Sequence, residues 1–157
     1  MRVVIVLAWC ALMALYLLTA PLLPAELGEA GKQMHRFAYL AVMMGVSSFT
    51  VFIAGGTLMR ALARRWPMAV NLPHRSYWLA PERREASIER LASLMDGMRL
   101  LTLAMFAGLH IFLLWQARPE WPQPPAWLGM VAIAALVLAF LGWVIRIHRA
   151  FPAPPTR

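Results

Sequence analysis

Four stretches of this sequence are apolar and free of charged side chains over lengths that match a lipid bilayer. One of them lies between Arg36 and Arg60, where no Asp, Glu, Lys or Arg occurs. A hydrocarbon core of about 30 Å requires about 20 apolar residues in an α-helix. The sequence therefore predicts four transmembrane helices, at about residues 3–23, 37–59, 100–117 and 127–145.

The composition agrees with a membrane protein. Of the 157 residues, 61% are hydrophobic and 14% are charged, and the mean hydropathy is +0.62. Soluble domains usually have about 45 to 50% apolar and about 25% charged residues. The single cysteine, Cys10, excludes a disulfide scaffold. We expect an all-α, polytopic membrane protein with one membrane domain over residues 1–157.

The distribution of basic residues predicts the topology. The side that holds the amino terminus, the segment 60–99 and the carboxyl tail carries 12 of the 15 Lys and Arg residues. The opposite side carries only Lys32, Arg36 and Arg118. Because short loops rich in Lys and Arg stay in the cytoplasm, we expect a bacterial inner-membrane protein with both termini in the cytoplasm.

The first predicted span could instead be a cleaved signal peptide. Arg2, an apolar core and small residues near Ala20 and Ala25 fit that alternative. The apolar run is longer than the 7 to 15 residues that are usual for a signal peptide. Pro21 and Pro24 crowd the possible cleavage sites. We therefore expect an uncleaved anchor; with cleavage, three spans would remain.

The segment 60–99 is predicted to be an arginine-rich cytoplasmic loop, with eight arginines against four acidic residues. Pro73 disfavours helical geometry at Leu72, so we expect extended or turned chain up to Ala80. Pro81 suits the first position of a helix. This helix is predicted to continue into the third span as an amphipathic extension, with one face formed by Ile88, Leu91, Met95 and Met98.

The loop contains a long and compositionally unusual string of residues. It consists of Asn71, Pro73, Tyr77, Trp78, Leu79, Ala80, Pro81, Glu82, Arg83 and Arg84. The string resembles a loop in a bacterial family of uncharacterised polytopic membrane proteins that is related to the amino-terminal module of the Sdp toxin immunity protein. The resemblance implies an architecture of membrane spans and no reaction. Members usually have a longer outer loop after the first span than residues 26–36 provide here.

His110 lies inside the third predicted span, where an ionisable side chain is a functional candidate. Haem ligation by two histidines would need a second imidazole at similar depth. His35 is at the outer boundary, and His74 and His148 are on the cytoplasmic side. We therefore expect a neutral His110 that is hydrogen bonded to Ser47, Ser48 or Thr50 on a neighbouring helix.

The sequence lacks the motifs of several other functions. None of the seven acidic residues lies within a predicted span, which disfavours a self-contained ion-coupled carrier. Asp96 is expected to pair with Arg99 at the inner edge of the third span. No nucleophile elbow, phosphate-binding glycine loop or metal-ligand spacing is present. The basic residues occur without a nucleic-acid recognition motif. We expect no enzymatic activity, no cofactor, no bound metal and no nucleic-acid partner.

We predict a non-catalytic accessory or interaction protein, with toxin immunity or signalling as variants. Its contacts would be with the lipid bilayer and a partner membrane protein. The alternative is a subunit of a membrane redox or transport complex that uses the intramembrane His110. The predicted docking residues are Asn71, Pro73, Arg75, Tyr77, Trp78, Glu82, Arg83 and Arg84.

Overall fold

The computed structural model describes residues 2–28, 33–53 and 56–154, and these are mostly helical. The main helices are α1 (Arg2–Thr19), α2 (Arg36–Phe52), α3 (Gly56–Arg65), α4 (Arg75–Trp78), α5 (Arg84–Gln116) and α6 (Ala126–Ala150). Two short 3-10 turns, η1 (Ala20–Leu22) and η2 (Pro67–Ala69), follow α1 and α3. The all-α class predicted from hydropathy is confirmed.

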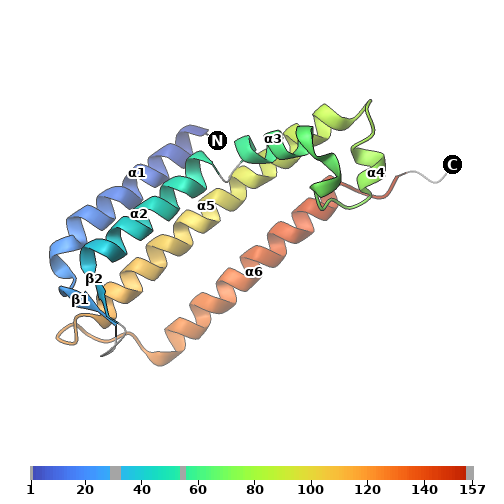
Figure 1. Cartoon of the computed structure of the whole chain (residues 1–157). Coiled ribbons are helices and arrows are strands. Elements are labelled where there is room, and N and C mark those ends of the chain that lie inside the picture. Colours follow the sequence, from blue (N-terminus) through green and yellow to red (C-terminus); the bar gives the residue numbers. More distant parts are fainter. Residues whose placement is uncertain (1, 29–32, 54–55, 155–157) are drawn as a thin grey trace.

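A small hairpin, which the sequence did not predict, precedes α2. Strand β1 (Glu26–Leu27) pairs antiparallel with β2 (Met34–His35), with Glu26 opposite His35. The hairpin and the connection between α5 and α6 lie at one end of the molecule, which we call the hairpin end (Figure 1). Helices α3 and α4 lie at the other end, which we call the arginine end. The start of α1 and the end of α6 are also at the arginine end (Figure 1).

Three of the described helices, α1, α5 and α6, are long and apolar enough to cross a membrane. The predicted second span, residues 37–59, is not one straight helix. Helix α2 ends at Phe52, α3 begins at Gly56, and the directions of the two differ by 56°. Together α2 and α3 pass the same test of length and composition.

The close packing of α3 on α5 explains why a glycine stands at the start of α3. A Cβ atom added at Gly56 would lie 3.2 Å from the backbone oxygen of Ala92 and 3.3 Å from its Cβ. A larger residue would have to push the helices apart. Two carboxylates of α5 then meet arginines of α3, because Arg60 pairs with Glu89 at 2.8 Å and Arg64 with Glu85 at 2.8 Å.

Helix α5 runs without interruption for 33 residues, as predicted for a span with an amphipathic extension. At 1.5 Å per residue it is about 50 Å long, well beyond the roughly 30 Å of a hydrocarbon core. Ile88 and Leu91 of the predicted face are buried, and Met95 and Met98 are half-buried. Helix α5 begins at Arg84, three residues after Pro81, and a turn in which the N–H groups of Arg83 and Arg84 donate to the carbonyl of Ala80 leads into it.

The buried side chains form two separate clusters. The first joins α1, α2 and α5 along the bundle (Figure 1); its members are Ile5, Leu12, Met13, Tyr16, Leu23, Tyr39, Leu40, Met43, Val51, Leu103 and Leu114. The second lies at the arginine end and contains Ala63, Val70, Leu72, Leu79, Ile88, Leu91, Leu94 and Phe151. The predicted arginine-rich loop therefore has a hydrophobic core of its own.

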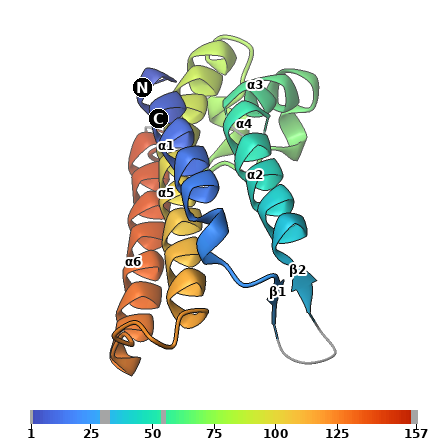
Figure 2. The same cartoon turned by 90° about the vertical axis from the view of Figure 1, so that its left-hand side faces the viewer.

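Helix α6 runs beside α5, outside the bundle of α1, α2 and α5 (Figure 2). The indole Nε1 of Trp143 donates a hydrogen bond to the carbonyl of Leu94 at 3.1 Å. Most of the large apolar side chains of α6 are exposed. They include Met130, Ile133, Val137, Leu138, Phe140, Leu141 and Ile145. Such an exposed apolar helix is stable in hydrocarbon and would be an aggregation hazard in water.

Phe151 is expected to anchor the carboxyl end in the second cluster. It is 1% exposed, whereas Phe140 of α6 is 47% exposed. Replacing Phe151 with alanine should cost about 3 kcal/mol, because it leaves a cavity in a packed cluster. Thermal or denaturant unfolding in mild detergent measures the loss. Phe140→Ala is the matched control, and an equal loss in both variants would contradict the assignment of Phe151 to the core.

Candidate functional site

The predicted docking residues lie together at the arginine end, around the single turn of α4. His74 precedes this turn with a positive φ of 51°, and its carbonyl accepts hydrogen bonds from the N–H groups of Tyr77 and Trp78. The sequence predicted extended or turned chain up to Ala80, and the structure has one helical turn there, at residues 75–78. Asn71, Glu82 and Arg83 are exposed; Pro73, Arg75, Tyr77, Trp78 and Arg84 are half-buried.

Tyr77 and Arg83 form one unit on this surface. The guanidinium carbon of Arg83 lies 4.1 Å from the centroid of the Tyr77 ring, which is a cation–π contact. The contact holds the ring against the turn that precedes α5. Because Arg83 is exposed, its charge faces outward and is accessible to a partner.

Trp78 has an internal role that sequence reasoning missed. Its Nε1 donates a hydrogen bond to the carbonyl of Pro152 at 3.1 Å, and its ring packs edge-on against Phe151 at 5.7 Å. Arg90 strengthens the same connection through a 2.8 Å hydrogen bond to the carbonyl of Ala150. Trp78 therefore ties α4 to the carboxyl segment, in addition to any contact with a partner.

The arginines of the arginine end divide into two groups. Arg60, Arg64 and Arg99 pair with carboxylates, and the predicted pair of Arg99 with Asp96 is confirmed at 3.2 Å. A second group has no carboxylate within 4 Å among the described residues; it contains Arg65, Arg75, Arg83, Arg84, Arg90, Arg146 and Arg149. Their positive charge is not neutralised within the described chain.

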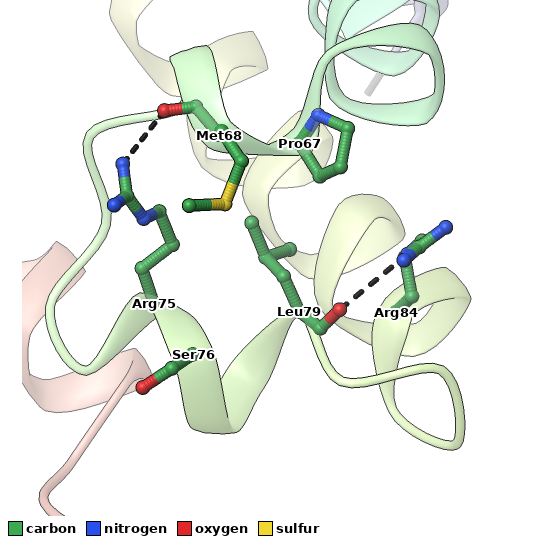
Figure 3. A pocket seen from close by; sticks show the side chains of 6 residues that line it. All are labelled: Pro67, Met68, Arg75, Ser76, Leu79 and Arg84. Atoms are coloured by element: carbon green, nitrogen blue, oxygen red, sulfur yellow. Dashed lines mark hydrogen bonds between the residues drawn. The ribbon is translucent and has the colours of Figure 1, made fainter.

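A cavity of about 330 Å³ opens beside α4 (Figure 3). Its lining combines cationic and apolar side chains: Pro67, Met68, Arg75, Ser76, Leu79 and Arg84. Arg75 and Arg84 lie on either side of Leu79, with Met68 and Pro67 opposite (Figure 3). Arg75 Nη1 donates to the carbonyl of Met68 at 2.6 Å, and Arg84 Nε donates to the carbonyl of Leu79 at 3.4 Å.

The arginines at the hairpin end are used internally. Arg36 donates to the carbonyl of Leu23 at 3.1 Å, and Arg118 donates to the carbonyl of Leu22 at 2.8 Å and to Glu120 at 3.1 Å. These bonds satisfy carbonyls where α1 ends in the turn η1. The backbone N–H of Glu120 and the Arg118 guanidinium lower the pKa of the Glu120 carboxyl. The arginine end therefore has more arginines than the hairpin end, and more of them are free of a carboxylate partner among the described residues.

His110 is fully buried and bridges three helices. Its Nε2 lies 2.7 Å from Thr19 Oγ1 of α1, and its Nδ1 lies 3.0 Å from the Tyr39 hydroxyl of α2. The predicted partners Ser47, Ser48 and Thr50 are wrong. Ser47 instead contacts the Tyr16 hydroxyl at 3.3 Å, Ser48 accepts from Trp9 Nε1 at 3.2 Å, and Thr50 donates to its own helix.

The hydrogen bonds around His110 assign its neutral tautomer. The Thr19 hydroxyl donates its proton to the carbonyl of Leu15 at 2.6 Å. Thr19 Oγ1 must therefore accept from His110, which places the proton on Nε2. Nδ1 is then the acceptor for the Tyr39 hydroxyl. Both ring nitrogens are engaged, so ligation of a haem iron would require breaking one of these bonds.

The sequence contains a signal that could have found these partners. Counted from the hairpin end, His110 lies six residues before the end of α5, and Tyr39 lies three residues after the start of α2. Thr19 is the last residue of α1. The three side chains share a depth, whereas Ser47, Ser48 and Thr50 lie two or more turns farther along α2.

Within residues 2–28, 33–53 and 56–154, no group of three His, Cys, Asp or Glu side chains is arranged to hold a metal ion. No family model, curated protein or solved structure matches this chain. The resemblance to the family related to the Sdp immunity protein stays a prediction.

The Thr19 and His110 contact is expected to stabilise the bundle. Thr19→Val leaves the Nε2 proton of His110 without an acceptor and should cost about 1 kcal/mol, since polar contacts between membrane helices have this magnitude. Unfolding in mixed detergent micelles measures the loss. Thr50→Val is the matched control, because the Thr50 hydroxyl bonds only to its own helix. Equal stability of the Thr19 and Thr50 variants would argue against the bridge.

Proposed function

We propose that this protein is a non-catalytic integral protein of the bacterial inner membrane that docks a partner membrane protein at its arginine end. The observation that carries the proposal is the set of arginines there without a carboxylate partner among the described residues. Proteins keep such charges for contacts with anionic groups on another molecule or on a membrane surface. Tyr77 and Arg83, joined by their cation–π contact, form the docking element.

The proposed role includes four membrane crossings. Helices α1, α5 and α6 are three of them, and α2, with 17 residues, meets the lower limit of about 17 for a span. Helix α3 then turns away by 56° and lies against the start of α5, where Arg60 and Arg64 pair with glutamates. With an even number of crossings both termini lie on one side, and the arginine excess places that side in the cytoplasm.

The alternative, a redox or transport subunit that uses His110, has less support. Both ring nitrogens of His110 are already hydrogen bonded, one to Thr19 and the other to Tyr39. A fully satisfied polar group of this kind fixes how helices pack, because an unsatisfied one in hydrocarbon is costly. We therefore assign His110 to the assembly of α1, α2 and α5.

Reporter fusions test the proposed topology. A reporter that is active only in the cytoplasm should work after Arg65 and after Arg157, and one that is active only outside should work after Gln123. The excess of Lys and Arg on the side of the two termini and segment 60–99 predicts this pattern. External activity of a fusion after Arg65 would refute both the four-span topology and the cytoplasmic docking surface.

Quantitative affinity capture from mild detergent tests docking. Replacing both Tyr77 and Arg83 with alanine should reduce recovery of the partner about tenfold, since tyrosine and arginine are enriched among the residues that dominate binding energy. The matched control replaces His148 and Arg149, an exposed ring and arginine at the same end of the molecule. Unchanged recovery in the Tyr77 and Arg83 variant, or an equal loss in the control, would count against docking at α4.

A further inference from the structure

We infer that the cavity beside α4 binds the headgroup of one anionic phospholipid, with the phosphate against Arg75, Arg84 on the other side of Leu79, and the start of an acyl chain along Met68 and Pro67. The inference deepens the proposed function, because it rests on the arginine end lying at the membrane surface. It concerns a different contact from the docking of a partner through Tyr77 and Arg83, neither of which lines the cavity.

The first argument is charge. Arg75 and Arg84 flank the cavity, and neither has a carboxylate within 4 Å among the described residues. A guanidinium has five N–H donors in a planar fork that matches the oxygens of a phosphate. The described chain uses one donor of Arg75, for the Met68 carbonyl, and one of Arg84, for the Leu79 carbonyl. The remaining donors are available to an anion.

The second argument is positional order. The bond from Arg75 to the Met68 carbonyl, at 2.6 Å, holds that guanidinium beside Met68 at one side of the cavity (Figure 3). Arg84 lies on the other side of Leu79, where its Nε donates to the Leu79 carbonyl (Figure 3). A guanidinium that is already held by the chain can bind a phosphate with little loss of side-chain freedom.

The third argument is the apolar part of the lining. Pro67, Met68 and Leu79 form the wall opposite and between the two arginines (Figure 3). Met68 is 71% exposed and the neighbouring Trp66 is 56% exposed. A free phosphate would gain nothing from these side chains. An amphiphile would cover them with its chain while its charge meets the arginines, and tryptophan is typical of the interface between headgroups and hydrocarbon.

The size of the cavity agrees with a headgroup. At about 330 Å³ it lies at the lower end of the range of small-molecule sites, about 300 to 1,000 Å³. It is too small for a whole lipid, whose acyl chains would continue along the outer surface of the protein. The exposed Met68, which lines the cavity, offers apolar surface to such a chain.

The test uses the full-length protein, purified in mild detergent and freed of native lipid. Dioctanoyl phosphatidylglycerol, dioctanoyl phosphatidylcholine and inorganic phosphate are titrated separately, and bound ligand is counted by native mass spectrometry. We expect one phosphatidylglycerol per protein, bound at least about tenfold more tightly than phosphatidylcholine, since the two guanidinium groups at the cavity repel the choline cation of the zwitterion. Inorganic phosphate should bind at least about tenfold more weakly than phosphatidylglycerol.

Arg75→Gln combined with Arg84→Gln should remove the preference for phosphatidylglycerol. The matched control, Arg146→Gln with Arg149→Gln, removes the same charge from exposed positions at the same end, outside the cavity. Met68→Glu places a negative charge in the cavity and keeps the backbone carbonyl that Arg75 binds. Because Met68 is exposed, this variant should fold, and it decides the question if the double arginine variant does not.

Several results would overturn the inference. An equal loss in the control would mean diffuse attraction to the whole arginine end. Phosphate binding as tight as lipid binding would assign the cavity to a free anion. No binding of any probe, or a preference for phosphatidylglycerol that persists in Met68→Glu, would show that the cavity is not a lipid site. Because lipid binding is measured in detergent, it does not depend on the orientation of the protein in the membrane. The reporter fusions that test the topology can therefore fail while the lipid-binding experiment succeeds, and the reverse.

Discussion

Hydrocarbon provides no hydrogen-bond partner, and this constraint governs the structure at both backbone and side-chain level. A helix satisfies its own peptide groups, which is why the apolar segments of this chain are helical. Polar side chains within them must find partners on neighbouring helices or in their own turn. His110, Tyr16 and Trp9 do so through Thr19, Tyr39, Ser47 and Ser48. These polar contacts fix the positions of α1, α2 and α5 relative to one another along their axes. Apolar contacts alone are less directional and would fix them less strictly.

Hydropathy and charge predicted the helical class and the continuous α5, because both depend on properties read along one dimension. Contacts between helices depend on how each helix is rotated, and a single sequence specifies this poorly. The partners of His110 were therefore misassigned to the more polar residues of α2. The change of direction between α2 and α3 was missed for a similar reason, since the contact of Gly56 with Ala92 of α5 joins residues far apart in the sequence.

The arginine end combines two uses of the same residue type. Arg60 and Arg64 join α3 to α5 by pairing with glutamates, and these ion pairs hold together the two helices on either side of α4 in the sequence. Arg75, Arg83 and Arg84 retain unpaired charge among the described residues. The sequence identified the segment by its charge, but it could not divide structural from available arginines. Which arginines are paired depends on which of them lie near Glu85 and Glu89 in the folded chain.

The second hydrophobic cluster closes on Phe151, which follows α6, and Trp78 binds the carbonyl of Pro152 beside it. Most members of this cluster precede the apolar part of α5 in the sequence, but Phe151 is synthesised only after α6. The segment around α4 therefore cannot complete its packing until α6 has been made. The order of synthesis thus couples the assembly of the arginine end to the insertion of α6.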